Sequence, residues 1–137
     1  MTAPAAPIAV VTGGAGFIGS HMVDLLRDRG IAVRVLDNLV GGRADNLAHH
    51  QNDAQVTLDT RDMVTVAGDD ALYADADYVF HFAGIGDIVP SIDQPVDYMR
   101  ANVMGTVAAL EGAVRGGLAL LVLGDWYDAQ LLSRLSF

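Results

Sequence analysis

The sequence of 137 residues contains no cysteine and no lysine. Without cysteine, the chain cannot form disulfides, thiolate metal sites or a cysteine nucleophile. Its eight basic residues are therefore all arginines, and 17 acidic residues bring the formal net charge to −9. Because proteins bind the phosphate backbone through clusters of Lys and Arg, this balance argues against nucleic acid as a partner.

Long apolar runs are also lacking. The opening MTAPAAP carries no basic residue and is not typical of a signal peptide. The longest later apolar run, residues 118–123, is far shorter than the roughly 18 residues that a membrane span requires. A hydrophobic fraction of 52% with 18% charged residues is typical of a globular chain. We therefore expect a cytoplasmic protein with no membrane partner.

Short apolar segments alternate with helical patterns along the chain. The predicted strands are residues 8–11, 31–36, 56–58, 78–82 and 118–123. The first predicted helix begins at Phe17 and has Phe17 and Ile18 on its apolar face. Two further helices are predicted at residues 44–50 and 95–115. This alternation predicts an α/β fold, a doubly wound parallel sheet (Rossmann-like) truncated after about five strands. We expect one domain at residues 8–123, an N-terminal tail at 1–7 and an atypical C-terminal tail at 124–137.

A glycine-rich loop separates the first strand from the first helix. Gly14-x-Gly16-x-x-Gly19 fits the dinucleotide fingerprint, and Gly13-x-x-Gly16-x-x-Gly19 fits its seven-residue variant. The first glycines allow the tight turn, Gly16 lets a pyrophosphate touch the backbone, and Gly19 lets the helix pack on the strand. Asp37 follows Gly19 by eighteen residues, at the end of the second strand.

The start of the first helix suits a bound phosphate. Its free N–H groups would face the phosphates, and no acidic residue precedes Asp24 to repel them. Asp37 would accept hydrogen bonds from the adenosine ribose, and its charge would repel a 2′-phosphate. The pattern therefore predicts NAD rather than NADP as the cofactor; the alternative is a glycine-rich turn that binds nothing.

Five motifs, in order, resemble the extended short-chain dehydrogenase/reductase family, specifically its NAD-dependent nucleotide-sugar epimerase/dehydratase branch, to which UDP-glucose 4-epimerase belongs. They are residues 12–21 (TGGAGFIGSH), 37–47 (Asp37-Asn38-Leu39, Gly42-Arg43, Asn46-Leu47), 59–62 (DTRD), 81–84 (HFAG) and 102–106 (NVMGT). The resemblance covers about residues 8–117.

The resemblance implies a role for each matched residue. Gly13, Gly16, Phe17, Ile18 and Gly19 would line the pyrophosphate loop, and Asp37 and Asn38 would hold the adenosine ribose with Arg43 nearby. Asp59 and Thr60 would meet the adenine, and Phe82, Ala83 and Gly84 would pass beneath the phosphates and the nicotinamide ribose. Asn102 would brace the fourth strand and the 95–115 helix from inside.

One departure from the family concerns catalysis. After the fifth strand, the family carries a Tyr-x-x-x-Lys pair, in which the lysine lowers the pKa of the tyrosine that abstracts the sugar hydroxyl's proton. A phenol with a pKa near 10 is a poor base at neutral pH without a nearby cation. Tyr127 is followed four residues later by Leu131, so we expect no catalytic residue in this chain.

Three interpretations remain open. The chain is a cofactor-binding module that is inactive alone, an active nucleotide-sugar 4-epimerase or dehydratase when a partner chain supplies the missing half, or a non-functional truncated remnant. The identity of the sugar is not determined by these residues. Self-association is expected, through the exposed edge of the 118–123 strand or through the 95–115 helix, which pairs with its copy in family dimers.

The four histidines suggest no metal site. His49 and His50 are adjacent, so on a helix they would point about 100° apart and could not share a metal face. His81 lies within an apolar strand, where a hydrogen-bonded core histidine is the expected role.

Overall fold

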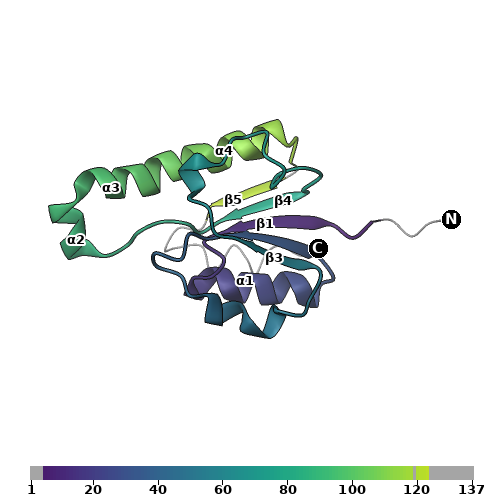
Figure 1. The fold of residues 1–137 in the computed structure, drawn as a ribbon. Coiled ribbons are helices and arrows are strands. Elements are labelled where there is room, and N and C mark those ends of the chain that lie inside the picture. The colour runs from purple at the N-terminus through teal and green to yellow at the C-terminus, as the bar shows by residue number, and fades with distance from the viewer. Residues whose placement is uncertain (1–4, 119, 124–137) are drawn as a thin grey trace.

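The computed structural model describes residues 5–118 and 120–123, and within them five parallel strands pair in the order β3-β2-β1-β4-β5. The strands are β1 (Ile8–Thr12), β2 (Ala32–Leu36), β3 (Val56–Asp59), β4 (Tyr78–His81) and β5 (Leu120–Leu123). Figure 1 shows α1 (Phe17–Asp28) on one face of the sheet and α4 (Gly105–Arg115) on the other. The doubly wound α/β prediction is confirmed. The expected C-terminal tail, with Tyr127, lies outside the described residues.

The strand order reverses beside β1. The chain runs from β1 outward through β2 to β3, then returns to place β4 on the other side of β1. In register, Thr12 at the end of β1 lies between Leu36 of β2 and His81 of β4. Ligands of open α/β sheets bind outside the carboxyl ends of the strands at such a switch point. This edge is therefore the place to look for a site.

The central strand β1 is apolar up to Thr12 because both faces of the sheet are covered. Side chains alternate between the faces, so Val11 packs with Val23 and Leu26 in the layer under α1. Val10 packs with Ala109 in the layer under α4. All the side chains of β1 beyond Ile8 are fully buried, which explains the continuous apolar run.

The first helix differs from the prediction at its start. Met22, Val23 and Leu26 of α1 are buried as the apolar pattern indicates. Phe17 and Ile18, which were assigned to the same face, are 79% and 57% exposed. They belong to the first turn, which borders an open groove instead of the sheet.

The helix expected at residues 95–115 consists of three consecutive segments. These are α3 (Pro95–Met99), a π-helical stretch η3 (Arg100–Met104) and α4. An additional helix, α2 (Ile88–Asp93), precedes them and was not predicted. It is only six residues long and contains Pro90, which is tolerated there because the first turn of a helix leaves its N–H groups without intrahelical partners.

The predicted apolar stripe of this helical segment faces outward. Its residues, Val96, Met99, Val103, Val107 and Leu110, are between 39% and 76% exposed. Small residues on the opposite side, Ala109 and Gly112, pack toward the sheet. Figure 1 shows α2 and α3 extending past the sheet as an arm. None of the described helices is long and apolar enough to cross a membrane.

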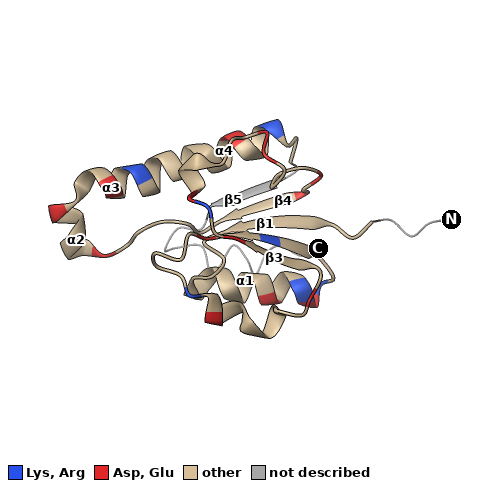
Figure 2. Ribbon diagram, in the orientation of Figure 1, with Lys and Arg blue, Asp and Glu red and all other residues tan. Residues whose placement is uncertain are grey.

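Three further short elements complete the described fold. They are the 3-10 helices η1 (Ala44–His50) and η2 (Met63–Thr65), and the turn around Gly30, which ends α1 with a φ of +74°. The prediction of a short helix at residues 44–50 is confirmed. Figure 2 shows the arginines of the described residues distributed over the sheet and both helical layers.

Candidate dinucleotide-binding site

A groove runs along the carboxyl edge of the sheet at the switch point. It consists of two adjoining cavities of about 610 and 550 Å³, which share Gly13, Gly16 and the loop of residues 82–86. Sites for small molecules and cofactors typically measure about 300–1,000 Å³. The groove therefore has the size and the position that a nucleotide cofactor requires.

Gly13 shapes the turn that leaves β1. Its φ of +68° lies in the left-handed region, and a Cβ atom there would lie 2.6 Å from the backbone nitrogen of Ala83. The N–H of Gly13 donates to the carbonyl of Leu36 (2.8 Å), which ties the turn to the end of β2. Only glycine fits both the backbone angle and the approach of the loop after β4.

Gly19 allows close packing, although against a different partner from the one predicted. A Cβ at Gly19 would contact the carbonyl oxygen of Gly13 and lie 2.7 Å from the Cα of Gly14. Those atoms belong to the loop that follows β1, not to the strand itself. The first turn of α1 therefore rests directly on the turn of the glycine loop.

The N-terminus of α1 opens onto the groove. Its N-cap is Gly16, which has no side chain to bond the first amides, and the first turn contains no acidic residue. Gly16, Phe17 and Ile18 all line the groove. Unpaired N–H groups and the helix dipole favour an anion at such a position.

Asp37 lies at the end of β2, and its carboxylate faces the glycine loop. It accepts hydrogen bonds from the backbone N–H groups of Ala15 and Leu39, both at 2.9 Å. The side chain is 8% exposed, yet it lines the groove. Gly42 passes close by, since a Cβ there would lie 2.6 Å from the Asp37 Oδ2 atom.

The other residues predicted at the adenosine end divide into two groups. Asn38 lines the groove. Arg43, Asp59 and Thr60 are not among its described lining residues. The exposed Arg43 side chain pairs with Asp45 at 3.2 Å, although its backbone N–H donates to the Ala15 carbonyl (2.9 Å).

Two arginines of the groove were missed by the sequence analysis. Arg61 lies between two carboxylates, with Nη2 2.6 Å from Asp59 and Nη1 2.8 Å from Asp70. The hydrogen bonds from Arg61 lower the pKa of Asp70 to about 2, and both carboxylates raise the pKa of Arg61. Arg100 reaches across to Asp62 at 2.8 Å. The only sequence signal for Arg61 is its place in the 59–62 motif.

At the other end of the groove, Asn102 holds the loop after β4. Its Oδ1 accepts from the N–H of Ile85 (2.7 Å), and its Nδ2 donates to the carbonyl of the same residue (3.0 Å). Asn102, Phe82, Ala83 and Gly84 all line the groove. Asn102 thus braces the loop between β4 and the helical arm, rather than the strand itself.

His81 lines this end of the groove and belongs to a chain of buried and part-buried hydrogen bonds. Thr106 Oγ1 donates to the Asn102 carbonyl (2.6 Å), so it accepts from His81 Nε2 (3.1 Å). His81 Nδ1 then accepts from Thr12 Oγ1 at 2.5 Å. Burial lowers the pKa of His81 to about 4, so the ring is neutral at physiological pH. The expected role of a hydrogen-bonded core histidine is confirmed.

The fold and the groove together define a Rossmann-like α/β domain with the glycine loop of dinucleotide-binding proteins. The model of the NAD dependent epimerase/dehydratase family matches residues 9–124. The chain belongs to this family, as its motifs indicate, and NAD, the cofactor expected from the sequence, is the cofactor of the family.

Relatives with assigned activities share the same region. UDP-glucuronic acid decarboxylase 4 of Arabidopsis thaliana is 38% identical over 113 residues, which cover 82% of this chain and 24% of that protein. The UDP-N-acetylglucosamine 4-epimerase from Methanobrevibacter ruminantium M1, solved in complex with UDP-N-acetylmuramic acid, superposes with a TM-score of 0.74. The two sequences are 31% identical, and the similarity covers 85% of this chain and 36% of the epimerase chain.

A third relative was solved with a cofactor. DesIV, a dTDP-glucose 4,6-dehydratase from Streptomyces venezuelae with NAD and TYD bound, has a TM-score of 0.72 and 33% identity. The similarity covers 83% of this chain and 38% of DesIV. The chain thus spans between 24% and 38% of the length of these three relatives.

Proposed function

We propose that this chain binds NAD in the groove at the carboxyl edge of the sheet. The pyrophosphate lies over Gly13, Gly16 and Gly19, and the adenosine ribose lies beside Asp37 and Asn38. The nicotinamide half extends over the loop of residues 82–84 toward Asn102. Arg43, Asp59 and Thr60 border the adenine end from outside, because their neighbours Gly42 and Arg61 line the groove.

The observation that carries this proposal is the open N-terminus of α1 in the groove. Gly16 as N-cap leaves the first amides accessible, and Ile18 of the first turn lines the groove while 57% exposed. With no acidic residue in that turn, the field of the helix attracts the two negative charges of a pyrophosphate.

Asp37 supports NAD over NADP. A carboxylate offers about four lone-pair sites, and the Ala15 and Leu39 N–H groups use two of them. The remaining sites can accept the two ribose hydroxyls. A 2′-phosphate at the same position would meet the carboxylate charge, which two neutral N–H donors do not cancel.

We further propose that the whole protein acts on a nucleotide sugar, as the decarboxylase, epimerase and dehydratase among its relatives do. When bound, NAD supplies a reversible hydride acceptor. The 137 residues contain no lysine, so a Tyr-x-x-x-Lys pair has to come from residues outside them. This chain alone therefore binds the cofactor without turning over a sugar. If a partner chain supplies the missing half, adding that partner would restore turnover. If this chain is instead a non-functional remnant, it would not bind NAD.

Ile18→Glu tests the binding mode while leaving the core intact. The new carboxylate would stand in the first turn of α1 within the groove, where it repels the pyrophosphate but favours the helix dipole. We expect calorimetric titration to show NAD affinity reduced about tenfold or more, with an unchanged or slightly higher melting temperature.

Ile18→Gln is the matched control because glutamine has the size of glutamate and no charge. We expect it to retain most of the NAD affinity of the natural sequence. Equal affinities of the Glu and Gln variants would place the pyrophosphate elsewhere and overturn the proposal. If the chain alone turned over an added nucleotide sugar, this would contradict the proposal that the chain without further residues is inactive.

A further inference from the structure

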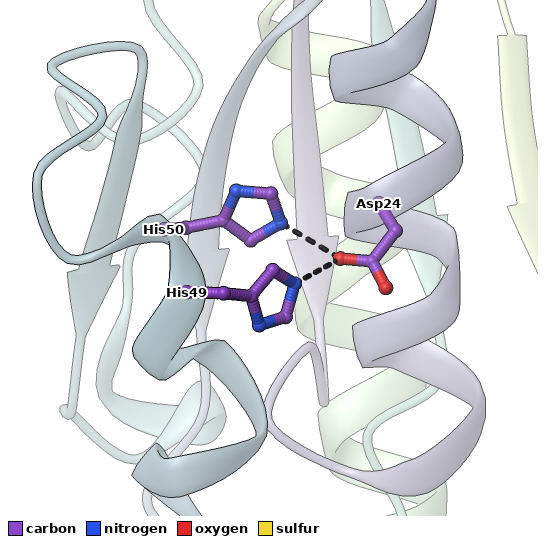
Figure 3. Close-up of side chains that lie close together, drawn as sticks. All are labelled: Asp24, His49 and His50. Carbon is purple, nitrogen blue, oxygen red and sulfur yellow. Dashed lines mark hydrogen bonds and ion pairs between the residues drawn. The ribbon is translucent and has the colours of Figure 1, made fainter.

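Two histidines of η1 converge on one carboxylate of α1. The Nε2 atoms of His49 and His50 each lie 2.7 Å from Oδ1 of Asp24. Figure 3 shows both rings leaning toward α1 from the same side. One ligand atom from each of the three residues lies within 4.8 Å of the others, and none of the three residues lines the nucleotide groove.

The sequence analysis predicted that the two adjacent histidines could not share a metal face, and this convergence removes the reason given for that prediction. That prediction assumed ring directions about 100° apart, as on an α-helix. On the 3-10 helix η1 adjacent residues diverge by about 120°, yet the two histidine rings lie against one another with centroids 4.2 Å apart. Side-chain rotation thus brings both Nε2 atoms to the same oxygen.

The backbone around the cluster is held at both ends of η1. Leu47 is buried in the core, and the Asn46 side chain donates to the Ala15 carbonyl at 2.8 Å. At the other end, the Asp53 N–H donates to the His50 carbonyl at 2.9 Å. The cluster therefore rests on anchored backbone, which lowers the entropy lost when a ligand fixes its side chains.

We propose that Asp24, His49 and His50 form a binding site for a divalent transition metal ion of the zinc type. Two imidazole nitrogens and one carboxylate oxygen form a common three-residue zinc ligand set, with ligand distances of about 2.0–2.2 Å. Harder cations such as Ca²⁺ and Mg²⁺ prefer oxygen ligands alone.

Metal binding would require the three ligand atoms, which lie within 4.8 Å of one another, to move to the spacing of a tetrahedral site. Ligand atoms around a tetrahedral zinc ion lie about 3.3 Å apart, so the 2.7 Å contacts to Asp24 would open by about half an ångström. The His50 side chain is 13% exposed, whereas the His49 and Asp24 side chains are 56% and 43% exposed. The fourth position would therefore face solvent on the His49 side and hold water.

The local charges also suit a cation. The Asp24 carboxylate supplies a negative charge, and a bound ion would displace the Nε2 protons that the two histidines donate to it. A second carboxylate, Asp53, lies near His50. The nearby Arg27 is paired with Asp53 at 2.7 Å, which neutralises much of its repulsion of a bound metal.

The test uses the chain without a polyhistidine tag, titrated with Zn²⁺ by calorimetry and with Co²⁺ by visible absorption. We expect one Zn²⁺ per chain, a tetrahedral Co²⁺ spectrum and a higher melting temperature with Zn²⁺. His49→Ala, His50→Ala and Asp24→Asn should each weaken binding about 10- to 100-fold and remove the thermal shift.

His21→Ala is the matched control, because His21 is an exposed histidine on the same helix outside the cluster. We expect it to bind Zn²⁺ like the natural sequence. Circular dichroism without metal shows whether each variant is folded. If a histidine variant unfolds, Asp24→Asn, which keeps the size of the side chain, still tests the site. The absence of stoichiometric binding, or equal binding by the folded cluster variants, would overturn the proposal.

Discussion

The carboxylate of Asp37 accepts a hydrogen bond from the backbone N–H of Ala15 at 2.9 Å, which joins the end of β2 to the glycine loop after β1. A residue proposed to hold the cofactor's ribose therefore also fixes the loop that is proposed to bind the pyrophosphate. The two roles are compatible because a carboxylate accepts several hydrogen bonds at once.

Asp37→Asn separates charge from shape. The amide oxygen keeps one accepted hydrogen bond, but the negative charge and the second acceptor are lost. We expect NAD affinity to fall about tenfold and the preference for NAD over NADP to shrink, because hydrogen bonds to charged groups contribute about 1.5–3 kcal/mol. Calorimetric titration with NAD and with NADP measures the ratio of the two affinities. Asn38→Ala changes an uncharged residue next to Asp37 and should keep the ratio of NAD to NADP affinity. An unchanged ratio in Asp37→Asn would contradict the assignment of Asp37 to the adenosine ribose.

Acid should destabilise the fold through His81. Its pKa is about 4 in the folded chain against an ordinary 6.5, because it is buried. The unfolded state therefore binds more protons between these values, and stability falls as the pH drops from 6.5 toward 4. The difference corresponds to about 3 kcal/mol.

Urea unfolding at several pH values measures this dependence. His81→Asn cannot take up the proton, so its stability should change less than that of the natural sequence over this range, even if it starts lower. His21→Ala removes an exposed histidine and should keep the full slope. Parallel pH profiles of His81→Asn and the natural sequence would show that His81 is not the titrating group.

Gly112 of α4 packs directly against the ring of Tyr73. A Cβ atom at Gly112 would overlap the Tyr73 ring, and Tyr73 is only 1% exposed. Gly112→Ala should therefore lower the free energy of unfolding by about 1–3 kcal/mol despite alanine's higher helix propensity. Gly41→Ala is the control, since no heavy atom lies within 4 Å of its added Cβ. A stabilised Gly112→Ala variant would contradict this packing.

The exposed apolar stripe along α3, η3 and α4 should drive self-association. Val103 and Val107 are 46% and 42% exposed and lie one turn apart on the outer face. We expect sedimentation to show concentration-dependent dimers, and Val103→Glu with Val107→Glu to give monomers. Val40→Glu adds a charge at an exposed valine outside the helix and should leave association unchanged. A natural chain that stays monomeric at high concentration would contradict the prediction.

The positions of the strands and the glycine loop were predictable because their signals are local. Fully buried parallel strands read as apolar runs, and Gly13 has an angle that only glycine adopts readily. Phe17 and Ile18 were misplaced because periodicity identifies an apolar face but not what covers it. Arg61 was missed because its place in the groove depends on Asp70, nine residues away in a loop without regular pattern.

The histidine cluster shows a different limit. Adjacent residues diverge by about 100° on an α-helix and about 120° on a 3-10 helix, so the convergence of His49 and His50 follows from their side-chain conformations, which the sequence pattern does not specify. Asp24 joins them from α1, 25 residues earlier than His49. Such a long-range contact follows from the packing of η1 on α1, which no local pattern encodes.

The central claim is that this chain alone holds NAD, and calorimetric titration of the purified chain with NAD and, separately, with NADP tests it most directly. The account predicts saturable binding of one NAD per folded chain and weaker binding of NADP. No heat with either cofactor, from a sample that circular dichroism shows to be folded, would contradict it.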